Sequence, residues 1–238
     1  MKIKFVGVLS AIVLTLFVAT VHVFAQGAYT TGTIGNDVSW PNCSAKAPTN
    51  AAFGIVGVTG GLGFSQNTCL AKEAQWFKNL TLYVNTGYPG SYRGLDYQNY
   101  PRACASTDLP CLAYNYGYNA GLYALNYANS QNIRSTTWWL DVETQNSWTS
   151  DPTQNRQSLQ GEYDALAANG VTTIGAYSTT YQWNTITGTW KNGWPNWGAS
   201  TWRTAKQAAT YCTGHEFTGG TTYLIQYIGK TFDQDYAC

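Results

Sequence analysis

Charged residues are scarce in this sequence, and their scarcity excludes two kinds of partner. Asp, Glu, Lys and Arg together make up 11% of the 238 residues, and the basic residues are not clustered. Nucleic acids and acidic membrane surfaces are bound through clustered Lys and Arg side chains. We therefore expect neither a nucleic acid nor, once a leader segment is removed, a membrane as a partner.

Patterns for metal binding and for nucleophilic catalysis are missing as well. The sequence has no H-E-x-x-H segment and no C-x-x-C pair, and only one histidine, His215, follows the N-terminal apolar segment. A Ser-His-Asp or Cys-His site would have to use His215, which lies in a Gly- and Thr-rich stretch with no G-x-S-x-G segment. We predict that His215 is a loop residue and that the protein uses no metal and no cofactor.

Long apolar runs are absent except near the N-terminus. Two lysines precede an apolar stretch over residues 6–17, and Ala25 is a small residue at a plausible cleavage position. A basic start, a short apolar middle and a small residue at the cut are typical of a secretory signal. We therefore predict a signal peptide over residues 1–25, one domain over residues 26–238, and a secreted, monomeric protein.

All six cysteines follow the predicted signal, and an even number in an exported chain indicates three disulfides. Six cysteines allow fifteen pairings. Proximity in the sequence favours two of the pairs, and elimination gives the third. The expected pairs are Cys104 with Cys111, Cys212 with Cys238, and Cys43 with Cys69.

Aromatic residues are abundant, with ten Trp and eighteen Tyr in the chain. Aromatic rings pack well against the faces of sugar rings, and sugar hydroxyls are bound by neutral polar groups more than by ions. A nearly uncharged, aromatic-rich, exported protein is therefore expected to bind a polysaccharide.

Residues 136–143, Thr-Thr-Trp-Trp-Leu-Asp-Val-Glu, form a β-prone run that ends in two acids. Side chains alternate along a strand, so Asp141 and Glu143 are predicted to share a face, with α-carbons roughly 6.6 Å apart. Two carboxyl groups this close favour one raised pKa and one ionised partner, as acid/base cleavage of a glycosidic bond requires. The alternative is that one acid caps a helix and the other is a surface charge.

The rest of the chain predicts strands and helices in alternation, with a long loop over residues 88–112. Strands are expected at 34–39, 51–59, 81–85, 136–143, 171–177, 196–200 and 223–228, and helices at 69–78, 114–130 and 153–169. Residues 181–190 form either a helix or an aromatic loop, and residues 204–211 either a short helix or a turn.

This order predicts an α/β fold, namely an irregular, disulfide-stabilised (β/α)8 TIM-like barrel with seven or eight parallel strands and fewer helices than strands. The C-terminal ends of the strands meet at one face of such a barrel. Six polar residues should then gather around one rim: Asp37, Tyr83, Asp141, Glu143, Tyr177 and Gln226.

Four segments resemble the family 25 glycoside hydrolases, the N-acetylmuramidase type of lysozyme. They are Asp37-Val38-Ser39, Leu140-Asp141-Val142-Glu143, Tyr177-Ser178, and Gln226-Tyr227 followed by Asp233 and Asp235. They occur in the family's order over most of the chain. The resemblance implies a secreted glycoside hydrolase that cleaves a β-linked amino-sugar polysaccharide such as peptidoglycan.

The resemblance also implies roles for individual residues. Glu143 would be the general acid, and Asp141 would orient the substrate or stabilise the cationic transition state. Asp37 and either Asp233 or Asp235, of which we choose Asp235, would complete the acidic cluster. Tyr83, Tyr177 and Gln226 would line the sugar site.

One feature of the sequence leaves other interpretations open. Where family members carry a lysine and then a glutamate near the end of the second strand, this chain has Gly57-Val58-Thr59-Gly60-Gly61. The alternative is a carbohydrate-binding or wall-binding protein without catalysis, in which Trp183 or Trp197 would contact sugar. For any single tryptophan, packing in the core is the competing interpretation. A secreted amidase or protease with a carboxylate pair is a third possibility.

Overall fold

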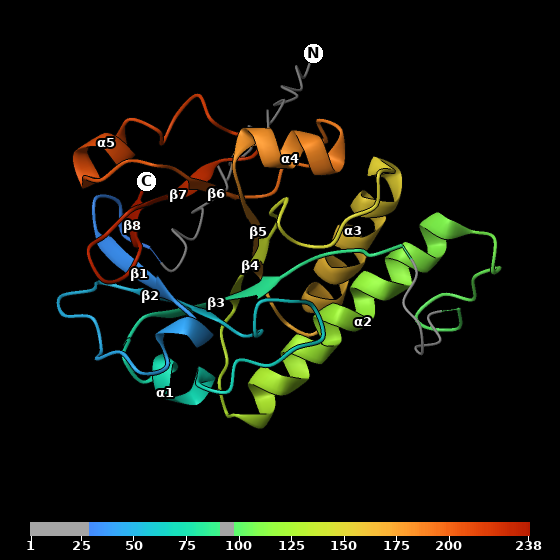
Figure 1. Cartoon of the computed structure of the whole chain (residues 1–238), viewed down its shortest axis with the longest axis horizontal. Helices are drawn as coiled ribbons and strands as arrows, with labels where there is room; N and C mark the ends of the chain where they lie inside the picture. The colour runs from blue at the N-terminus through green and yellow to red at the C-terminus, as the bar shows by residue number, and fades with distance from the viewer. Residues whose placement is uncertain (1–28, 91–97) are drawn as a thin grey trace, which may run out of the picture.

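A computed structural model of the chain describes residues 29–90 and 98–238, and the predicted signal peptide lies outside these residues. Eight strands close into a barrel in which sequential strands are neighbours (Figure 1). The strands are β1 (Ile34–Val38), β2 (Gly54–Gly57), β3 (Leu80–Asn85), β4 (Thr137–Asp141), β5 (Thr173–Ser178), β6 (Asn196–Ala199), β7 (Thr222–Tyr227) and β8 (Gln234–Ala237).

The described residues contain fewer α-helices than strands, as predicted. The helices are α1 (Leu70–Ala74), α2 (Leu109–Ser130), α3 (Pro152–Ala168), α4 (Thr180–Thr187) and α5 (Ala205–Ala209), with a short 3-10 helix, η1, at Trp40–Asn42. The fold class is therefore confirmed as an irregular eight-stranded α/β barrel. None of these helices is long and apolar enough to cross a bilayer.

Two helix boundaries differ from the sequence-based expectation for clear physical reasons. Helix α2 begins five residues earlier than expected, because the Asp108 side chain accepts a hydrogen bond from the Cys111 amide at 3.1 Å and Pro110 occupies the first turn. The ambiguous segment 181–190 contains a helix, α4. The Thr179 hydroxyl caps its start and Gly188, at φ 61°, ends it in the left-handed conformation.

The seven strands located from the sequence are parallel, as expected, and the eighth, which was not located, is not. Strand β8 is antiparallel to both of its neighbours, β7 and β1, and closes the barrel between them. The chain turns back directly after β7 without a helical crossover, and a short connection of this kind can only produce an antiparallel neighbour. Asp235 therefore lies within a strand and not in a loop that follows the last strand.

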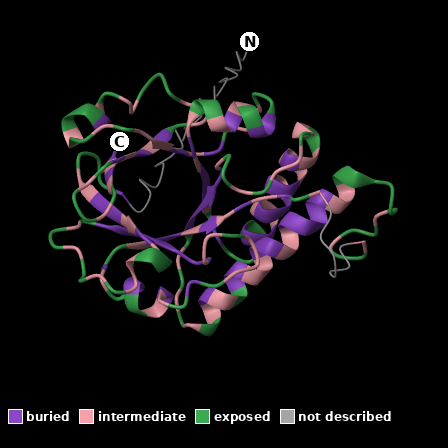
Figure 2. Cartoon of the chain, viewed as in Figure 1, coloured by how far each residue is buried: buried purple, intermediate pink, exposed green. Residues whose placement is uncertain are grey.

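The core has an inner and an outer apolar layer, because strand side chains alternate between the two faces of the sheet. Large rings fill the barrel interior, among them Phe53, Trp139 and Trp197. The outward-facing side chains of β3 to β5, such as Leu82 and Trp138, pack beneath the surrounding helices. The barrel strands and the inner sides of α2 and α3 are accordingly the most buried parts of the molecule (Figure 2).

Helices α2 and α3 lie side by side on one flank of the barrel (Figure 1), and glycines allow their close contact. A Cβ atom added at Gly161 of α3 would overlap the backbone carbonyl of Tyr114 in α2, and one added at Gly117 would overlap that of Ser158. Backbone atoms cannot move aside as flexible side chains can. Glycine is therefore required at both positions for this separation of the helices.

Three disulfides are present, and they are the pairs that proximity and elimination favoured. They join Cys43 to Cys69, Cys104 to Cys111, and Cys212 to Cys238. The third ties the end of β8 to the segment after α5. Covalent links of this kind are typical of proteins from oxidising compartments.

Replacing Gly161 with Ala should destabilise the protein even though alanine has the higher helix propensity. The added methyl group forces α2 and α3 apart, and overpacking of this kind costs about 1–3 kcal/mol. Urea denaturation with the disulfides intact measures the loss in the free energy of unfolding. Gly63→Ala is the control, because its nearest non-neighbouring atom would be 3.7 Å away. Equal stability of the Gly161→Ala variant and the wild type would contradict this account of the helix contact.

Candidate active site

Side chains from six strands or their ends, most of them polar, gather around a small cavity at one mouth of the barrel. The cavity has a volume of about 180 Å³. It is lined by Asp37, Tyr83, Asp141, Glu143, Tyr177, Trp197 and Gln226. The six residues expected around one rim are therefore brought together, and Trp197 joins them.

Strand register explains why these residues meet. Asp141 pairs with Asn85 on one side and with Tyr177 on the other, and Tyr177 pairs with Trp197. Paired residues on neighbouring strands project from the same face, which here is the inner face. Glu143 follows Asp141 by two residues and lines the same cavity, although β4 itself ends at Asp141.

Asp141 is 5% exposed and is held from both the side chain and the backbone. The Asn85 amide donates a hydrogen bond to its Oδ2, and the Thr86 hydroxyl donates one to its backbone oxygen at 2.6 Å. Its Oδ1 is buried and has no hydrogen-bond partner among the described residues. Burial, followed by the nearby charge of Glu143, raises the pKa of Asp141 well above its ordinary value.

Glu143 is half-buried, so it is the member of the pair with better access to solvent. Burial raises its pKa, and a hydrogen bond from Gln182 opposes that rise by stabilising the ionised form. Gln182 is positioned because its Oε1 accepts a hydrogen bond from the Thr144 amide at 2.6 Å. The charge of Glu143 in turn makes ionisation of Asp141 less favourable, so the two acids are not ionised independently.

Asp37 and Asp235 form a second pair of acids on β1 and β8. Asp235 is fully buried, and its Oδ1 accepts a hydrogen bond from the Trp197 indole at 2.8 Å. Burial raises the pKa of Asp37 to about 7 and that of Asp235 further, and a hydrogen bond between them lowers the first and raises the second. Both acids of this pair are therefore harder to ionise than free carboxyl groups.

The position of Asp235 differs from that expected for a group that contacts substrate. It does not line the cavity, because it lies inside the barrel beneath Trp197 and next to Asp37. Asp233, the other candidate, is exposed on the segment before β8 and also does not line the cavity. The structure thus makes Asp235 a supporting partner of Asp37.

A chain of hydrogen bonds links three of the cavity residues. The Tyr177 hydroxyl donates to Gln226 Oε1 at 2.7 Å, and Gln226 Nε2 donates to Asp37 Oδ2 at 3.0 Å. These residues come from β5, β7 and β1. The chain fixes the side-chain amide of Gln226 and ties the polar wall of the cavity together.

The prediction that Trp183 contacts substrate is wrong in this structure. Trp183 is 0% exposed and donates its indole N–H to the backbone oxygen of Trp190 at 2.7 Å. It stacks on Trp190 and lies edge-on to Trp194 in the layer outside the barrel. Trp197 is the tryptophan of this region that reaches the cavity, because its strand position faces inward.

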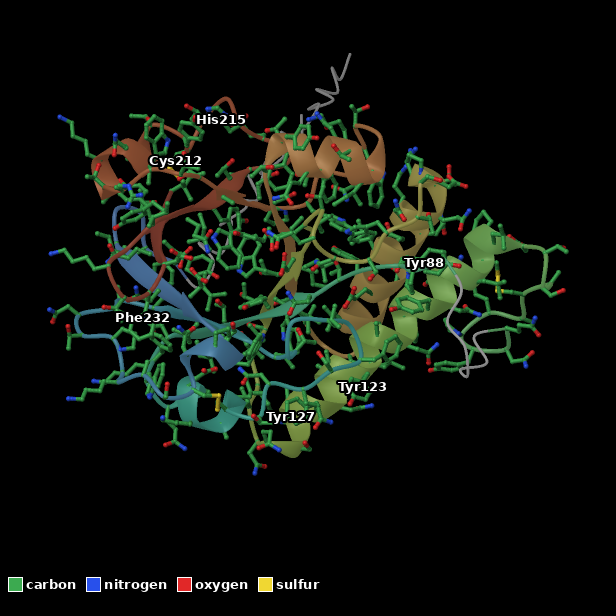
Figure 3. All side chains as sticks on the ribbon, viewed as in Figure 1. Tyr88, Tyr123, Tyr127, Cys212, His215 and Phe232 are labelled. Carbon is green, nitrogen blue, oxygen red and sulfur yellow. A yellow bond between two sulfur atoms is a disulfide. The ribbon has the colours of Figure 1, made fainter. Side chains whose placement is uncertain are left out.

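Sequence reasoning missed Asn85 and Gln182 as supporting residues. The position of Asn85 at the end of a predicted strand, like that of Asp141, was a usable signal, since neighbouring parallel strands end at the same rim. Gln182 had no such signal, because it reaches Glu143 from α4. His215 is a loop residue as predicted. It is exposed, stacks on Tyr211 and lies near Cys212 (Figure 3), and it does not line the cavity.

The comparisons with known proteins identify the fold. A family model described as lysozyme-like protein 1 matches residues 109–218, a segment that contains Asp141, Glu143 and Tyr177 but not Asp37 or Gln226. No curated protein matches the sequence. The family model therefore covers less than half of the chain, and the comparison of the other residues rests on solved structures.

Three solved structures superpose on most of the chain. A muramidase from Acremonium alcalophilum is 16% identical, with coverage of 87% of this chain and 93% of that one and a TM-score of 0.58. A glycosyl hydrolase 25 of Streptococcus pneumoniae is 15% identical, with 87% of each chain covered and a TM-score of 0.54. A lysozyme from Streptomyces coelicolor is 16% identical, with 88% and 93% covered and a TM-score of 0.52. The chain thus has the fold of the family 25 glycoside hydrolases, as its motifs suggested.

The stability of the Asp37→Asn variant relative to the wild type should be greater at pH 8 than at pH 4. The folded-state pKa of Asp37 is about 7, above the unfolded value near 3.9, so its contribution to stability is lost as pH rises through this window. Asparagine cannot ionise and avoids that loss. Urea denaturation measures the difference in the free energy of unfolding between variant and wild type at each pH. This difference should favour the variant by at least about 1.4 kcal/mol more at pH 8 than at pH 4, which corresponds to one pKa unit.

Asp151→Asn is a control of opposite sign. Hydrogen bonds from Gln154 and Thr153 lower the pKa of the exposed Asp151 carboxyl. Ionised Asp151 stabilises the folded protein above the pKa that this group has in the unfolded chain, and this contribution is lost as pH falls. The substitution should therefore cost more stability at pH 8 than at pH 4. The same stability difference at both pH values for Asp37→Asn would contradict the burial of an uncharged Asp37.

Proposed function

We propose that the protein is a secreted glycoside hydrolase that cleaves a β-linked amino-sugar polysaccharide, with peptidoglycan as the substrate. The observation that carries this proposal is the cavity in which Glu143, Asp141 and Asp37 meet, each with a raised pKa. Pairs of acids with perturbed pKa values in a cleft are characteristic of acid/base sites. Carbohydrate hydrolysis uses such pairs.

In the proposed reaction Glu143 donates its proton to the glycosidic oxygen as the bond from that oxygen to the anomeric carbon breaks. Glu143 suits this role because burial keeps it protonated at higher pH than a free carboxyl and because it remains open to the cavity. In the protonation state in which Glu143 is protonated and Asp141 is ionised, Asp141 stabilises the positive charge that develops on the sugar ring. Water completes the cleavage by adding hydroxide to the anomeric carbon and returning a proton to Glu143.

The remaining residues of the cavity would hold the sugar. Tyr83, Tyr177 and Trp197 supply aromatic surface, and Gln226 and Asp37 supply hydrogen-bonding groups whose positions are fixed by their mutual bonds. A cavity of about 180 Å³ is small beside the roughly 300–1,000 Å³ of typical ligand pockets. It therefore accommodates the reacting part of a polymer, with the flanking sugars outside it.

Peptidoglycan is the proposed substrate because the structural neighbours include proteins named as muramidases and a lysozyme. The lysozyme-like family model over residues 109–218 agrees with this choice. Export follows from the predicted signal peptide and is supported by the three disulfides. No cofactor enters the proposed reaction.

A carbohydrate-binding protein without catalysis is the second candidate, and one feature of β2 favours it. Gly57 occupies the region in which the resembled family carries its lysine. A Cβ atom at this position would lie 2.7 Å from the Tyr83 ring. The ring of Tyr83 thus takes the space that a side chain on β2 would need, and the rim differs from the family pattern here.

Glu143→Gln separates the two candidates, because it keeps the shape of the side chain and removes the transferable proton. Loss of a general acid typically costs about 10²–10⁴ in rate, so turnover of purified peptidoglycan should fall by at least about a hundredfold. Product release measured by mass analysis reports both turnover and the linkage that is cleaved.

Glu216→Gln is the matched control, since Glu216 lies in the segment before β7 and does not line the cavity. It should leave turnover unchanged. Wild-type protein that binds peptidoglycan but releases no product would establish the binding protein instead. Full activity of Glu143→Gln would exclude Glu143 as the acid.

Gln182→Ala should shift the alkaline limb of the pH profile of kcat/KM to higher pH. The Gln182 hydrogen bond favours ionised Glu143, so its removal raises the pKa of Glu143 and keeps the acid protonated at higher pH. Gln154→Ala, which removes an amide that bonds Asp151 at the start of α3, is the control and should leave the limb in place. A limb that stays fixed or moves to lower pH in Gln182→Ala would refute this role.

A further inference from the structure

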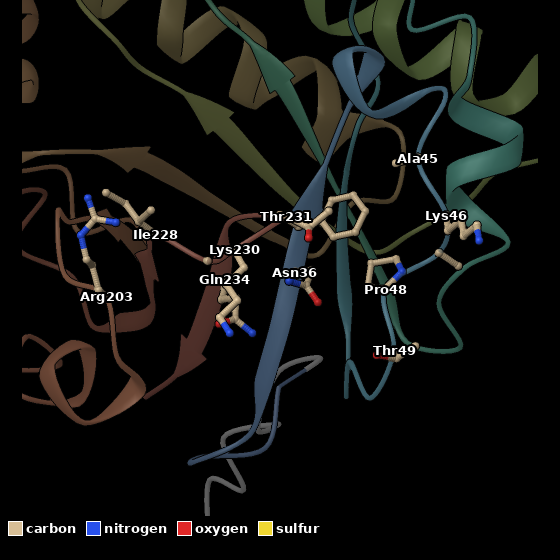
Figure 4. A pocket seen from close by; sticks show the side chains of 13 residues that line it. Asn36, Ala45, Lys46, Pro48, Thr49, Arg203, Ile228, Lys230, Thr231 and Gln234 are labelled. Atoms are coloured by element: carbon tan, nitrogen blue, oxygen red, sulfur yellow. The ribbon is translucent and has the colours of Figure 1, made fainter.

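A groove of about 850 Å³ lies on the outer wall of the barrel, separate from the cavity at its mouth. Its floor includes Asn36 of β1 and Gln234 of β8, and its sides are residues 45–49, residues 228–232 and Arg203. The close-up view shows these two strands between the flanking segments (Figure 4). Neither the mouth cavity nor the proposed reaction uses this groove.

The irregularity of the barrel creates the groove. The connections from β1 to β2 and from β7 to β8 contain no α-helix, so the outer wall here lacks the helix that follows a strand in a regular barrel. Asp37 and Asp235 face the interior, and their sequence neighbours Asn36 and Gln234 therefore face outward. Asn36 is held in place because its Nδ2 donates to the backbone oxygen of Asp233 at 2.9 Å.

The groove is cationic in a chain that has few charges. Lys46, Arg203 and Lys230 line it, and no acidic residue does. The side chains of these three residues make no hydrogen bond or ion pair with any described residue. Asp233 lies in sequence between Phe232 and Gln234, which line the groove, and sets one negative charge against these three positive charges. Among the described residues that line or directly flank the groove in sequence, an anion would therefore meet a net positive charge.

The three cations are spread along the groove and do not converge on one point (Figure 4). A single small anion could contact only one of them closely, whereas a polymer with charges along its length can reach all three. Asn36 and Gln234 provide amides between the cations, and Ile228, Phe232 and Pro48 provide apolar surface. Amides and apolar faces next to each other are suited to sugar rings.

We propose that this groove binds a glycan strand that bears carboxylate groups, as a second polysaccharide site beside the mouth of the barrel. The segment 228–233 joins Gln226 in the cavity to Gln234 in the groove, so the two sites adjoin across the turn between β7 and β8. The identification of this strand with peptidoglycan rests on the function proposed above. The proposed affinity of the groove for a carboxylated glycan does not depend on that function.

The test uses the full mature protein carrying Glu143→Gln, so that binding is measured without turnover. Co-sedimentation compares purified peptidoglycan with the same material after its carboxyl groups have been converted to neutral amides. The groove variant adds Lys46→Ala, Arg203→Ala and Lys230→Ala. We expect it to bind native peptidoglycan about tenfold more weakly than its parent, since exposed ionic contacts are individually weak and add up over three sites. It should bind the amidated material as its parent does.

A matched variant removes three cations elsewhere: Lys78, Arg134 and Arg156, each replaced by Ala. It lowers the net charge equally and does not touch the groove, so its binding should match that of the parent. Binding by the groove should also weaken as salt is raised, because exposed charges are screened. Equal losses in the two triple variants would reduce the effect to net charge and overturn the proposal.

Polygalacturonate, a soluble polymer with a carboxylate on each sugar, separates failure of the groove from failure of the proposed function. Protein that ignores peptidoglycan but binds polygalacturonate through the three cations would retain the groove and reject peptidoglycan as its ligand. Polyphosphate that binds as tightly as polygalacturonate would show a charge site without preference for glycans, and this would overturn the proposal. A groove variant that binds both peptidoglycan and polygalacturonate as tightly as its parent does would overturn the proposal as well.

Discussion

The mouth of this barrel collects more carboxyl groups than it can ionise, and this constraint governs the site. No lysine or arginine lines the cavity formed by the described residues, so no cation compensates the acids there. Burial makes each charged form costly, and adjacent acids make the second charge costlier still. The pKa values of all four acids are accordingly raised. A site whose acids keep their protons to higher pH than free carboxyl groups do is prepared for acid catalysis.

Strand alternation decides which side chains belong to this site, and it accounts for most of what could be predicted from the sequence. The spacing of Asp141 and Glu143 was enough to place both on the inner face. The same rule applied to the ends of the other predicted strands placed Asp37, Tyr83, Tyr177 and Gln226 at one rim. These predictions needed only the period of a strand and the common direction of barrel strands.

The failures occurred where alternation gives no information. Strand β8 has four residues, of which Asp235 and Ala237 are buried, so it shows no hydrophobic pattern, and its antiparallel direction follows from a short turn. Trp183 lies on a helix, so its face could not be derived from strand alternation, and the surrounding tryptophans pack it into the outer layer. Gln182 acts across space from that same helix, and only the fold brings it to Glu143.

Glycines on the inner face let large rings occupy the barrel interior. Gly57 leaves room for the ring of Tyr83, and Gly175 leaves room for that of Trp139, which would overlap any side chain there. Each ring covers a position on the neighbouring strand, so the large side chains and the glycines depend on one another. The ring of Tyr83 covers Gly57 of β2, so a lysine side chain at this position would overlap Tyr83 as it is placed. The absence here of the lysine that the resembled family carries is therefore explained by the packing of Tyr83.

The distribution of charge on the two sides of β1 and β8 follows from the same alternation. Asp37 and Asp235 face the interior, whereas Asn36 and Gln234 face the groove in which Lys46, Arg203 and Lys230 lie. These two strands thus separate the acids on the inner face from exposed cations on the outer face. Burial raises the pKa of Asp37 and of Asp235, so at a given pH these acids carry less negative charge, and oppose an anion in the groove less, than free carboxyl groups would. An anionic strand in the groove would in turn favour the protonated forms of the acids inside, because negative charge nearby raises the pKa of a carboxyl group. The electrostatics of the groove and of the barrel mouth are thereby linked through β1 and β8.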